Sequence, residues 1–190
     1  MRSPGRGPPP LTSAPSAPPA PFLDASHELR PDSSLLDVGS GYGKVVLHAA
    51  LCGAVARSEG VEFVAGRAER ASELLSALRS GELAPRMQTE PAELVQRLAR
   101  CALRCGDATS ARESLDFSHI YMYDKVFAPH TLRALAPKLS ASKRLRVLVS
   151  YRPLSAWLQL GLKGRWASAG SICMRTTGGQ NFTAFILARI

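Results

Sequence analysis

The stretch LLDVGSGYGK at residues 35–44 decides the fold that this sequence predicts. It is a short apolar run that ends in an acid, followed by three glycines at every second position. An apolar run at helical spacing comes next, at residues 45–50. A strand that leads through a glycine turn into a helix opens a nucleotide-binding α/β unit, because glycine adopts turn dihedrals closed to other residues and lets a ligand approach the backbone. The helix behind the turn offers free N–H groups and a positive dipole end to that ligand.

After this turn the chain alternates between strand-like apolar runs and helix-like amphipathic runs. We predict strands at residues 34–38, 60–63, 102–105, 119–123 and 147–150, and helices at residues 22–31, 42–56, 66–79, 92–101 and 129–139. Two β-prone runs, at residues 172–176 and 181–190, flank the sequence TGGQ and predict a hairpin. The pattern predicts a Rossmann-like α/β fold, with a mostly parallel seven-stranded sheet that ends in an antiparallel hairpin.

The composition predicts a single soluble domain behind a tail. Residues 1–21 are rich in Pro, Ala, Ser and Gly and contain no acid, so we predict a disordered tail followed by one domain at residues 22–190. Organelle targeting is the alternative for this tail, although its prolines oppose the amphipathic helix that import needs. The net charge of +9 indicates either a polyanionic partner or a domain that is simply basic. No stretch approaches the ~18 consecutive apolar residues that span a bilayer.

An acid beside the glycine turn indicates which ligand the turn binds. Asp37 stands two residues before Gly39, and the third glycine, Gly43, comes one residue earlier than in the dinucleotide fingerprint. A carboxylate at this place repels a pyrophosphate but pairs with an ammonium group. S-adenosylmethionine carries an amine and a positive sulfonium, so the turn predicts S-adenosylmethionine as the cofactor.

Two further acids follow predicted strands. Glu62 ends the second strand, where a carboxylate can accept hydrogen bonds from both ribose hydroxyls, and Asp107 follows the third, where it can receive the adenine amino group. Because the carboxyl ends of parallel strands meet at one edge, we expect these acids to converge on one cofactor; a helix cap or a solvated loop is the alternative for each alone. The predicted cofactor-binding residues are Asp37, Gly39, Ser40, Gly41, Gly43, Glu62 and Asp107.

Four stretches together resemble one enzyme family. They are LDVGSGYGKVVL at residues 36–47, GVE at residues 60–62, GD at residues 106–107 and YMYDKVF at residues 121–127. These stretches are similar to the disruptor-of-telomeric-silencing family of non-SET histone lysine methyltransferases, over residues 31–190. The resemblance implies a class I methyltransferase fold, S-adenosylmethionine as cofactor and a histone lysine, in a nucleosome, as acceptor. We therefore expect a nuclear or cytoplasmic protein.

The sequence departs from that family in two places. After the fourth strand the family has two asparagines before Phe-x-Phe, whereas this chain has Tyr123-Asp124-Lys125-Val126-Phe127 and keeps only the last aromatic. The family also has a helical lobe before the first strand, for which this chain offers only residues 22–30. These departures leave the activity and the choice of acceptor open.

The predicted methyl-transfer site is a narrow apolar channel in which an attacking amine loses its proton more easily, because desolvation disfavours its charged form. Its candidate catalytic residues are Tyr123, Asp124, Phe127 and Tyr151. Asp124 is expected to orient the amine or accept its proton, and the aromatic rings to contact its cationic head. Core packing is the alternative for Tyr123 and Phe127. We predict no metal site, since the histidines and cysteines show no ligand spacing.

A basic cluster offers a partner surface. Lys138, Lys143, Arg144 and Arg146 can contact nucleosomal DNA or an acidic protein, with simple solvation as the alternative. Two functions other than histone lysine methylation stay open. One is methyl transfer to a small molecule or a nucleic acid, and the other is S-adenosylmethionine binding without catalysis.

Overall fold

The structure is a computed structural model that describes residues 28–52, 55–81, 90–175 and 179–190. The tail predicted at residues 1–21 and most of the helix predicted at residues 22–31 lie outside the described residues. The part of that helix which is described, Glu28–Pro31, is not helical.

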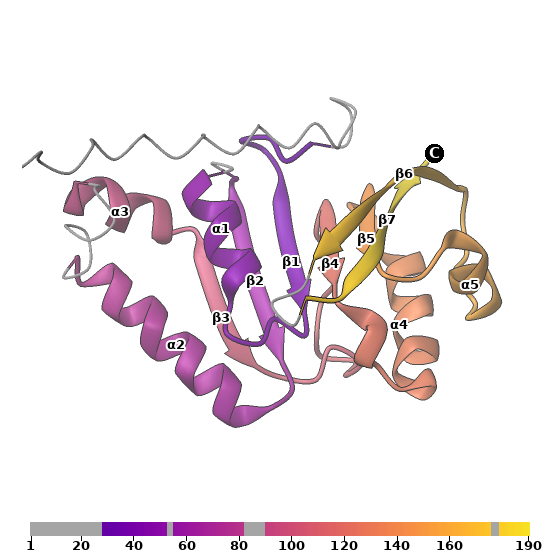
Figure 1. The fold of residues 1–190 in the computed structure, drawn as a ribbon, viewed down its shortest axis with the longest axis horizontal. Coiled ribbons are helices and arrows are strands. Elements are labelled where there is room, and N and C mark those ends of the chain that lie inside the picture. The colour runs from indigo at the N-terminus through magenta and orange to yellow at the C-terminus, as the bar shows by residue number, and fades with distance from the viewer. Residues whose placement is uncertain (1–27, 53–54, 82–89, 176–178) are drawn as a thin grey trace, which may run out of the picture.

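Within the described residues, seven strands form one sheet in the order β3-β2-β1-β4-β5-β7-β6 (Figure 1). Their bounds are β1 Ser34–Val38, β2 Arg57–Glu62, β3 Cys101–Cys105, β4 His119–Met122, β5 Val147–Ser150, β6 Trp166–Arg175 and β7 Asn181–Arg189. Strands β1 to β5 run parallel, and β7 pairs antiparallel with both β5 and β6. The predicted Rossmann-like, mostly parallel seven-stranded sheet with a closing antiparallel hairpin is confirmed.

Helices cover both faces of this sheet. They are α1 Lys44–Cys52, α2 Ala65–Arg79, α3 Pro91–Leu98, α4 Pro129–Ala141 and α5 Leu154–Gln159, with a short 3₁₀ helix η2 at Asp124–Val126. Figure 1 shows α1, α2 and α3 on one side of the sheet and α4 and α5 on the other. Helix α5 was not predicted from the sequence, because six residues are too few to show a helical period.

The core follows the same division into two layers. Leu75 of α2 and Leu94 of α3 belong to a buried cluster with α1 and β3. Leu135 of α4 and Trp157 of α5 pack with Ile120 of β4 on the opposite face. Each such side chain contributes roughly 1.5–3 kcal/mol by leaving water. The helices cover the faces of the sheet, so the carboxyl ends of the parallel strands meet at an edge where ligands bind in this class of fold.

Candidate functional site

The glycine turn after β1 has the backbone that its sequence predicted. Gly39, Gly41 and Gly43 have φ angles of 78°, 54° and 78°, in the left-handed region that favours glycine. A Cβ atom on Gly39 would lie 3.0 Å from the ring of Phe127, and one on Gly43 would lie 2.6 Å from Leu103. A Cβ atom on Gly41 would meet nothing within 4 Å. The turn is therefore held by packing at its two outer glycines and faces open space at the middle one.

Glu62 at the end of β2 supports this turn. Its Oε2 accepts a hydrogen bond from the N–H of Gly41 at 2.8 Å, and its Oε1 accepts one from the N–H of Val64 at 2.9 Å. The side chain is buried. Each carboxylate oxygen can accept more than one hydrogen bond, so Glu62 still has capacity for the donors of a ligand.

Asp37 is the second buried acid at this edge. Asp37 is only 3% exposed, and within the described residues its carboxyl group accepts no hydrogen bond. Burial, and then the negative charge of Glu62, raise the pKa of Asp37 to about 7. Burying a carboxyl group without a partner is costly, and a positively charged ligand group beside it offsets that cost.

A cavity of about 680 Å³ opens at the carboxyl ends of the strands. Four predicted site residues besides Gly39 line it, namely Glu62, Asp107, Tyr123 and Phe127. The walls also contain residues that the sequence analysis did not single out, including Phe63, Val64, Arg67, Thr109, Val126, His130 and Thr131. These belong to no motif. Several of them follow a strand end by a few residues, and that position was the signal by which they could have been found.

Asp107 stands at the exposed rim of this cavity, two residues after β3. Its Oδ1 accepts hydrogen bonds from the N–H of Thr109 at 2.8 Å and from the hydroxyl of Thr109 at 2.7 Å. These two hydrogen bonds hold the pKa of Asp107 below its usual range. The carboxylate is thus ionised and fixed in orientation by one oxygen, which leaves the other free to accept from a ligand amino group.

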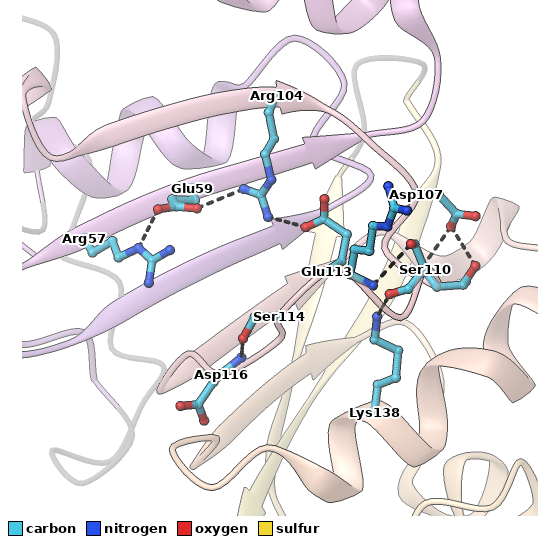
Figure 2. Close-up of polar contacts among 11 residues, drawn as sticks. Arg57, Glu59, Arg104, Asp107, Ser110, Glu113, Ser114, Asp116 and Lys138 are labelled. Atoms are coloured by element: carbon cyan, nitrogen blue, oxygen red, sulfur yellow. Dashed lines mark hydrogen bonds and ion pairs between the residues drawn. The ribbon is translucent and has the colours of Figure 1, made fainter.

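Asp107 is carried by residues 106–118, which connect β3 to β4 without a helix. A ladder of ion pairs holds this segment (Figure 2). Arg104 of β3 bridges Glu59 of β2, at 2.9 Å, and Glu113 of the segment, at 2.6 Å. Arg57 extends the ladder by pairing with Glu59. Because parallel strands are usually joined by a helix, these charges take over the role of fastening the crossover to the sheet.

The basic cluster of the sequence analysis is split by the fold. Lys138 donates a hydrogen bond to the carbonyl of Ser110 (Figure 2), and burial lowers its pKa. Lys143, Arg144 and Arg146 are exposed and directly precede β5. They therefore lie at the amino edge of the sheet, opposite the cavity. A nucleic acid held there would be separated from the cavity by the length of a strand, ~13 Å.

Asp124 does not face the cavity. It is completely buried, its Oδ2 accepts the hydroxyl of Ser150 at 2.7 Å, and its Oδ1 accepts the N–H of Tyr151 at 2.8 Å. Arg152 Nε lies 3.6 Å from Oδ2. Burial raises the pKa of Asp124, and these contacts oppose that rise. Both carboxylate oxygens thus join η2 to the end of β5, and Asp124 lies away from the position predicted for the attacking amine.

The predicted aromatic residues separate into two that line the cavity and one that supports them. Tyr123 packs edge to face against Tyr151, with 4.8 Å between ring centroids, and against Phe182 of β7, with 6.0 Å. Tyr151 is buried, and its hydroxyl lies 3.1 Å from that of Tyr121. Tyr123 and Phe127 line the cavity, whereas Tyr151 stands behind Tyr123 and fixes its ring.

Neither a metal-binding cluster nor a membrane-spanning helix is found among the described residues. No group of three or more His, Cys, Asp or Glu side chains among them is arranged to hold a metal ion. No helix in this part of the chain has both the length and the apolar composition needed to cross a membrane.

Solved structures of other proteins share the fold of this chain. Sp1610 of Streptococcus pneumoniae, a proposed tRNA (m1A22) methyltransferase, is 16% identical, with a TM-score of 0.59 over 86% of this chain and 66% of its own. The fold is that of class I methyltransferases. The m1A22 tRNA methyltransferase TrmK of Bacillus subtilis is 13% identical, with a TM-score of 0.55 over 85% of this chain and 62% of its own. The methyltransferase domain of bacterial CtHen1 is 12% identical, with a TM-score of 0.57 over 83% of this chain and 89% of its own.

Another structure of Sp1610 contains S-adenosylmethionine. This chain spans about two thirds of the length of Sp1610 and slightly less than two thirds of TrmK. No protein-family model and no curated protein sequence matches it.

The predicted membership in the disruptor-of-telomeric-silencing family is wrong. The similar structures of Sp1610 and TrmK are described as tRNA methyltransferases, and the comparisons give no support to a histone methyltransferase of that type. The physical reason is that the most specific part of the resemblance, the glycine turn, serves the nucleotide half of the fold, as the strand-end acids do, and does not depend on the acceptor. The acceptor half, around Tyr123 and Asp124, was the part in which the sequence departed from the family.

Proposed function

We propose that this protein is an S-adenosylmethionine-dependent methyltransferase whose acceptor is a ring nitrogen of an RNA base. One observation carries the proposal: the carboxylates of Glu62 and Asp107 share a single cavity with the aromatic rings of Tyr123 and Phe127. The acids suit a cofactor nucleoside, and the rings suit a planar acceptor. The likeness to Sp1610 and TrmK supports the choice of RNA as the acceptor class.

The residues of the site fit S-adenosylmethionine. The carboxyl group of Asp37 is buried without a hydrogen bond within the described residues, so it suits the ammonium group of the methionine end. The open face of Gly41 leaves room for a ligand against the backbone. Glu62 can accept from the ribose hydroxyls and Asp107 from the adenine amino group. A cavity of about 680 Å³ is of the size that holds such small molecules.

Bound S-adenosylmethionine would supply a methyl group on a positive sulfur; the acceptor nitrogen would bond to the methyl carbon, and the electron pair of the broken C–S bond would stay on sulfur. The protein has to hold the acceptor in line with that bond, which accounts for most of the rate enhancement in such a displacement. Tyr123 and Phe127 are placed to do so, because both rings line the cavity and both are held by packing, Tyr123 against Tyr151 and Phe127 against Gly39.

The contacts of Asp124 favour a base over a lysine as acceptor. A lysine amine has a pKa near ~10.4 and must lose a proton before it can attack. The carboxylate that was predicted to take that proton is buried and bonded to Ser150 and Tyr151. A ring nitrogen of adenine carries its lone pair without a proton at neutral pH, so it needs no base at this place. A flipped base can also stack on an aromatic side chain such as Tyr123.

Two measurements test the proposal. Calorimetric titration with S-adenosylmethionine should show binding by the wild-type chain, and methyl-labelled cofactor should transfer its label to tRNA or to unstructured RNA. Histone octamers, nucleosomes and duplex DNA serve as competing acceptors. Label found in histones and not in RNA would overturn the acceptor. Binding without transfer to any acceptor would indicate a module without catalysis, and the absence of binding would overturn the cofactor.

A further inference from the structure

Cations follow three of the parallel strands at the edge where the cavity opens. Lys44 comes after β1, Arg67 after β2 and Lys125 after β4, and all three are exposed. Because the carboxyl ends of parallel strands lie at one edge of a sheet, these residues lie at the same edge as the cavity. Arg67 is itself one of the lining residues.

These three cations have few partners in the fold, although Lys125 Nζ lies 5.5 Å from the centroid of the Phe182 ring. Within the residues that the structure describes, none of them forms an ion pair. Lys44 lies in the first turn of α1 and Arg67 in the first turn of α2. Neither of these two first turns contains an acidic residue. A helix N-terminus favours acids, and a cation there is unfavourable by ~0.3–1 kcal/mol. Their positions therefore do not serve the stability of the helices and suit an anion from outside the chain.

Exposed apolar side chains alternate with these cations. Tyr42 is 51% exposed, Phe63 is 75% exposed and Val126 is 74% exposed. Phe63 and Val126 also line the cavity. Rings and apolar groups interleaved with cations are typical of surfaces that bind unpaired nucleic acid, because the bases stack on the rings while the cations follow the phosphates.

The amino edge of the sheet differs in this respect. Lys143 and Arg146 are exposed there, but Phe117 and Trp166, two aromatic residues that the structure describes at that edge, are buried. The guanidinium of Arg57 lies over the ring of Phe117, at 4.3 Å from its centroid. Within the part of the chain that the structure describes, Phe117 and Trp166 are therefore not available for stacking, and this edge presents mainly charge.

We propose that the carboxyl-edge rim, defined as Tyr42, Lys44, Phe63, Arg67, Lys125 and Val126, receives an unpaired stretch of RNA. This inference rests on the proposed function for its choice of RNA, and it adds the surface and the single-stranded form of the partner. An unpaired strand presents its bases to the rim and can place one of them in the cavity, whereas a duplex offers mainly its backbone.

Fluorescence anisotropy with a labelled unstructured RNA of about 12 nucleotides tests the rim, since sites for unpaired strands span ~4–16 nucleotides. The double variant Lys44→Gln/Lys125→Gln removes two charges from the rim, and Lys143→Gln/Arg146→Gln removes the same charge from the amino edge. We expect the rim variant to weaken binding at least about tenfold and to lower the slope of log K against log salt by about 1.4. The amino-edge variant should change the affinity less than about twofold, and thermal melting confirms that both fold.

The variant Phe63→Ala provides a second test of the rim, one that does not depend on charge. It should weaken binding of the unpaired RNA and leave binding of a hairpin duplex of the same length unchanged. Equal losses in the two double variants would overturn the rim, as would tighter binding of the duplex than of the unpaired strand.

The methyl-transfer assay separates this inference from the proposed function. Transfer to RNA by the wild type together with equal RNA binding by both double variants overturns the rim alone. Selective loss of RNA binding in the rim variant, with no transfer to RNA by the wild type, overturns the function and leaves the rim standing.

Discussion

The buried carboxyl group of Asp37 lies beside the carboxylate of Glu62, on two neighbouring parallel strands. Asp37 pairs with Gly60, two residues before Glu62, so both side chains project near the same end of the sheet. Glu62 is bonded to the N–H groups of Gly41 and Val64, whereas Asp37 has no such donor within the described residues. Among the described residues no cation forms an ion pair with Asp37 or Glu62, and this has measurable consequences.

The first consequence is a pH dependence of cofactor binding. The pKa of Asp37 is raised to about 7, and an ammonium group bound beside it would lower that pKa again. Below pH 7 binding must therefore expel a proton, so the affinity for S-adenosylmethionine should rise by up to about tenfold per pH unit until pH 7 and level off above it. Calorimetry in two buffers of different ionisation enthalpy should detect the released proton at pH 6 and none at pH 8.

Asp37→Asn is the control for this behaviour. In the folded chain the pKa is raised from 3.8 to about 7, so the folded state holds its proton to higher pH than the unfolded state, and stability falls as pH rises through that window. The variant should unfold with a free energy higher by up to roughly 4 kcal/mol at pH 8, with little change at pH 4. It should bind the cofactor weakly at every pH. An unchanged stability at pH 8, measured by urea denaturation, would contradict a buried ionised Asp37.

Two substitutions at Gly41 separate backbone strain from occupied space. Gly41→Ala and Gly41→Arg place the same Cβ atom at a φ of 54°, at a cost of roughly 1–2 kcal/mol. Neither Cβ meets another atom within 4 Å, so both variants should fold with similar melting temperatures. Only arginine is long enough to fill the space in front of the turn, and only Gly41→Arg should lose S-adenosylmethionine binding. Equal affinities in the two variants would show that the cofactor does not approach this glycine.

Asp124→Asn should act on stability more than on chemistry. The carboxylate is completely buried and holds Ser150 and Tyr151, so weakening these charged hydrogen bonds should lower the free energy of unfolding by about 1–3 kcal/mol. Well below its melting temperature the variant should keep most of the wild-type kcat. A double-mutant cycle with Ser150→Ala should show coupling, because the two side chains share a hydrogen bond of 2.7 Å. Lost turnover at unchanged stability would instead assign Asp124 to the reaction.

Arg104→Gln should loosen the segment that carries Asp107. Arg104 bridges Glu59 and Glu113, and its removal leaves two carboxylates without their common partner. We expect KM for S-adenosylmethionine to rise several-fold with little change in kcat, and stability to fall by roughly 1–2 kcal/mol, since the ladder is partly exposed.

Glu93→Gln is the matched control for the Arg104 variant. It breaks an exposed pair with Arg97, four residues along α3, and should change stability by less than about 0.5 kcal/mol. A KM that is equally altered in both variants would show that the ladder has no specific effect on the site.

The helices and strands predicted correctly from the sequence are those that a short local pattern of residues determines. The predicted bounds of β1 and β5 match the structure because each is a short apolar run between turn residues. Strand β2 begins earlier than predicted, at Arg57, because its charged residues are accommodated by the ion-pair ladder rather than by an apolar core. Strand β6 also begins earlier, at Trp166, since its small and polar residues show no strand pattern.

The sequence by itself determined the glycine turn, the alternation of strands and helices, and the placement of acids near strand ends, because these depend on backbone dihedrals and on periods of a few residues. Only the tertiary structure decided which of these groups share a cavity. Glu62 and Asp107 reach it, whereas Asp124 is bound to Ser150 and Tyr151 and points away from it. The direction of a side chain is set by partners that lie far along the chain, and no local pattern records them.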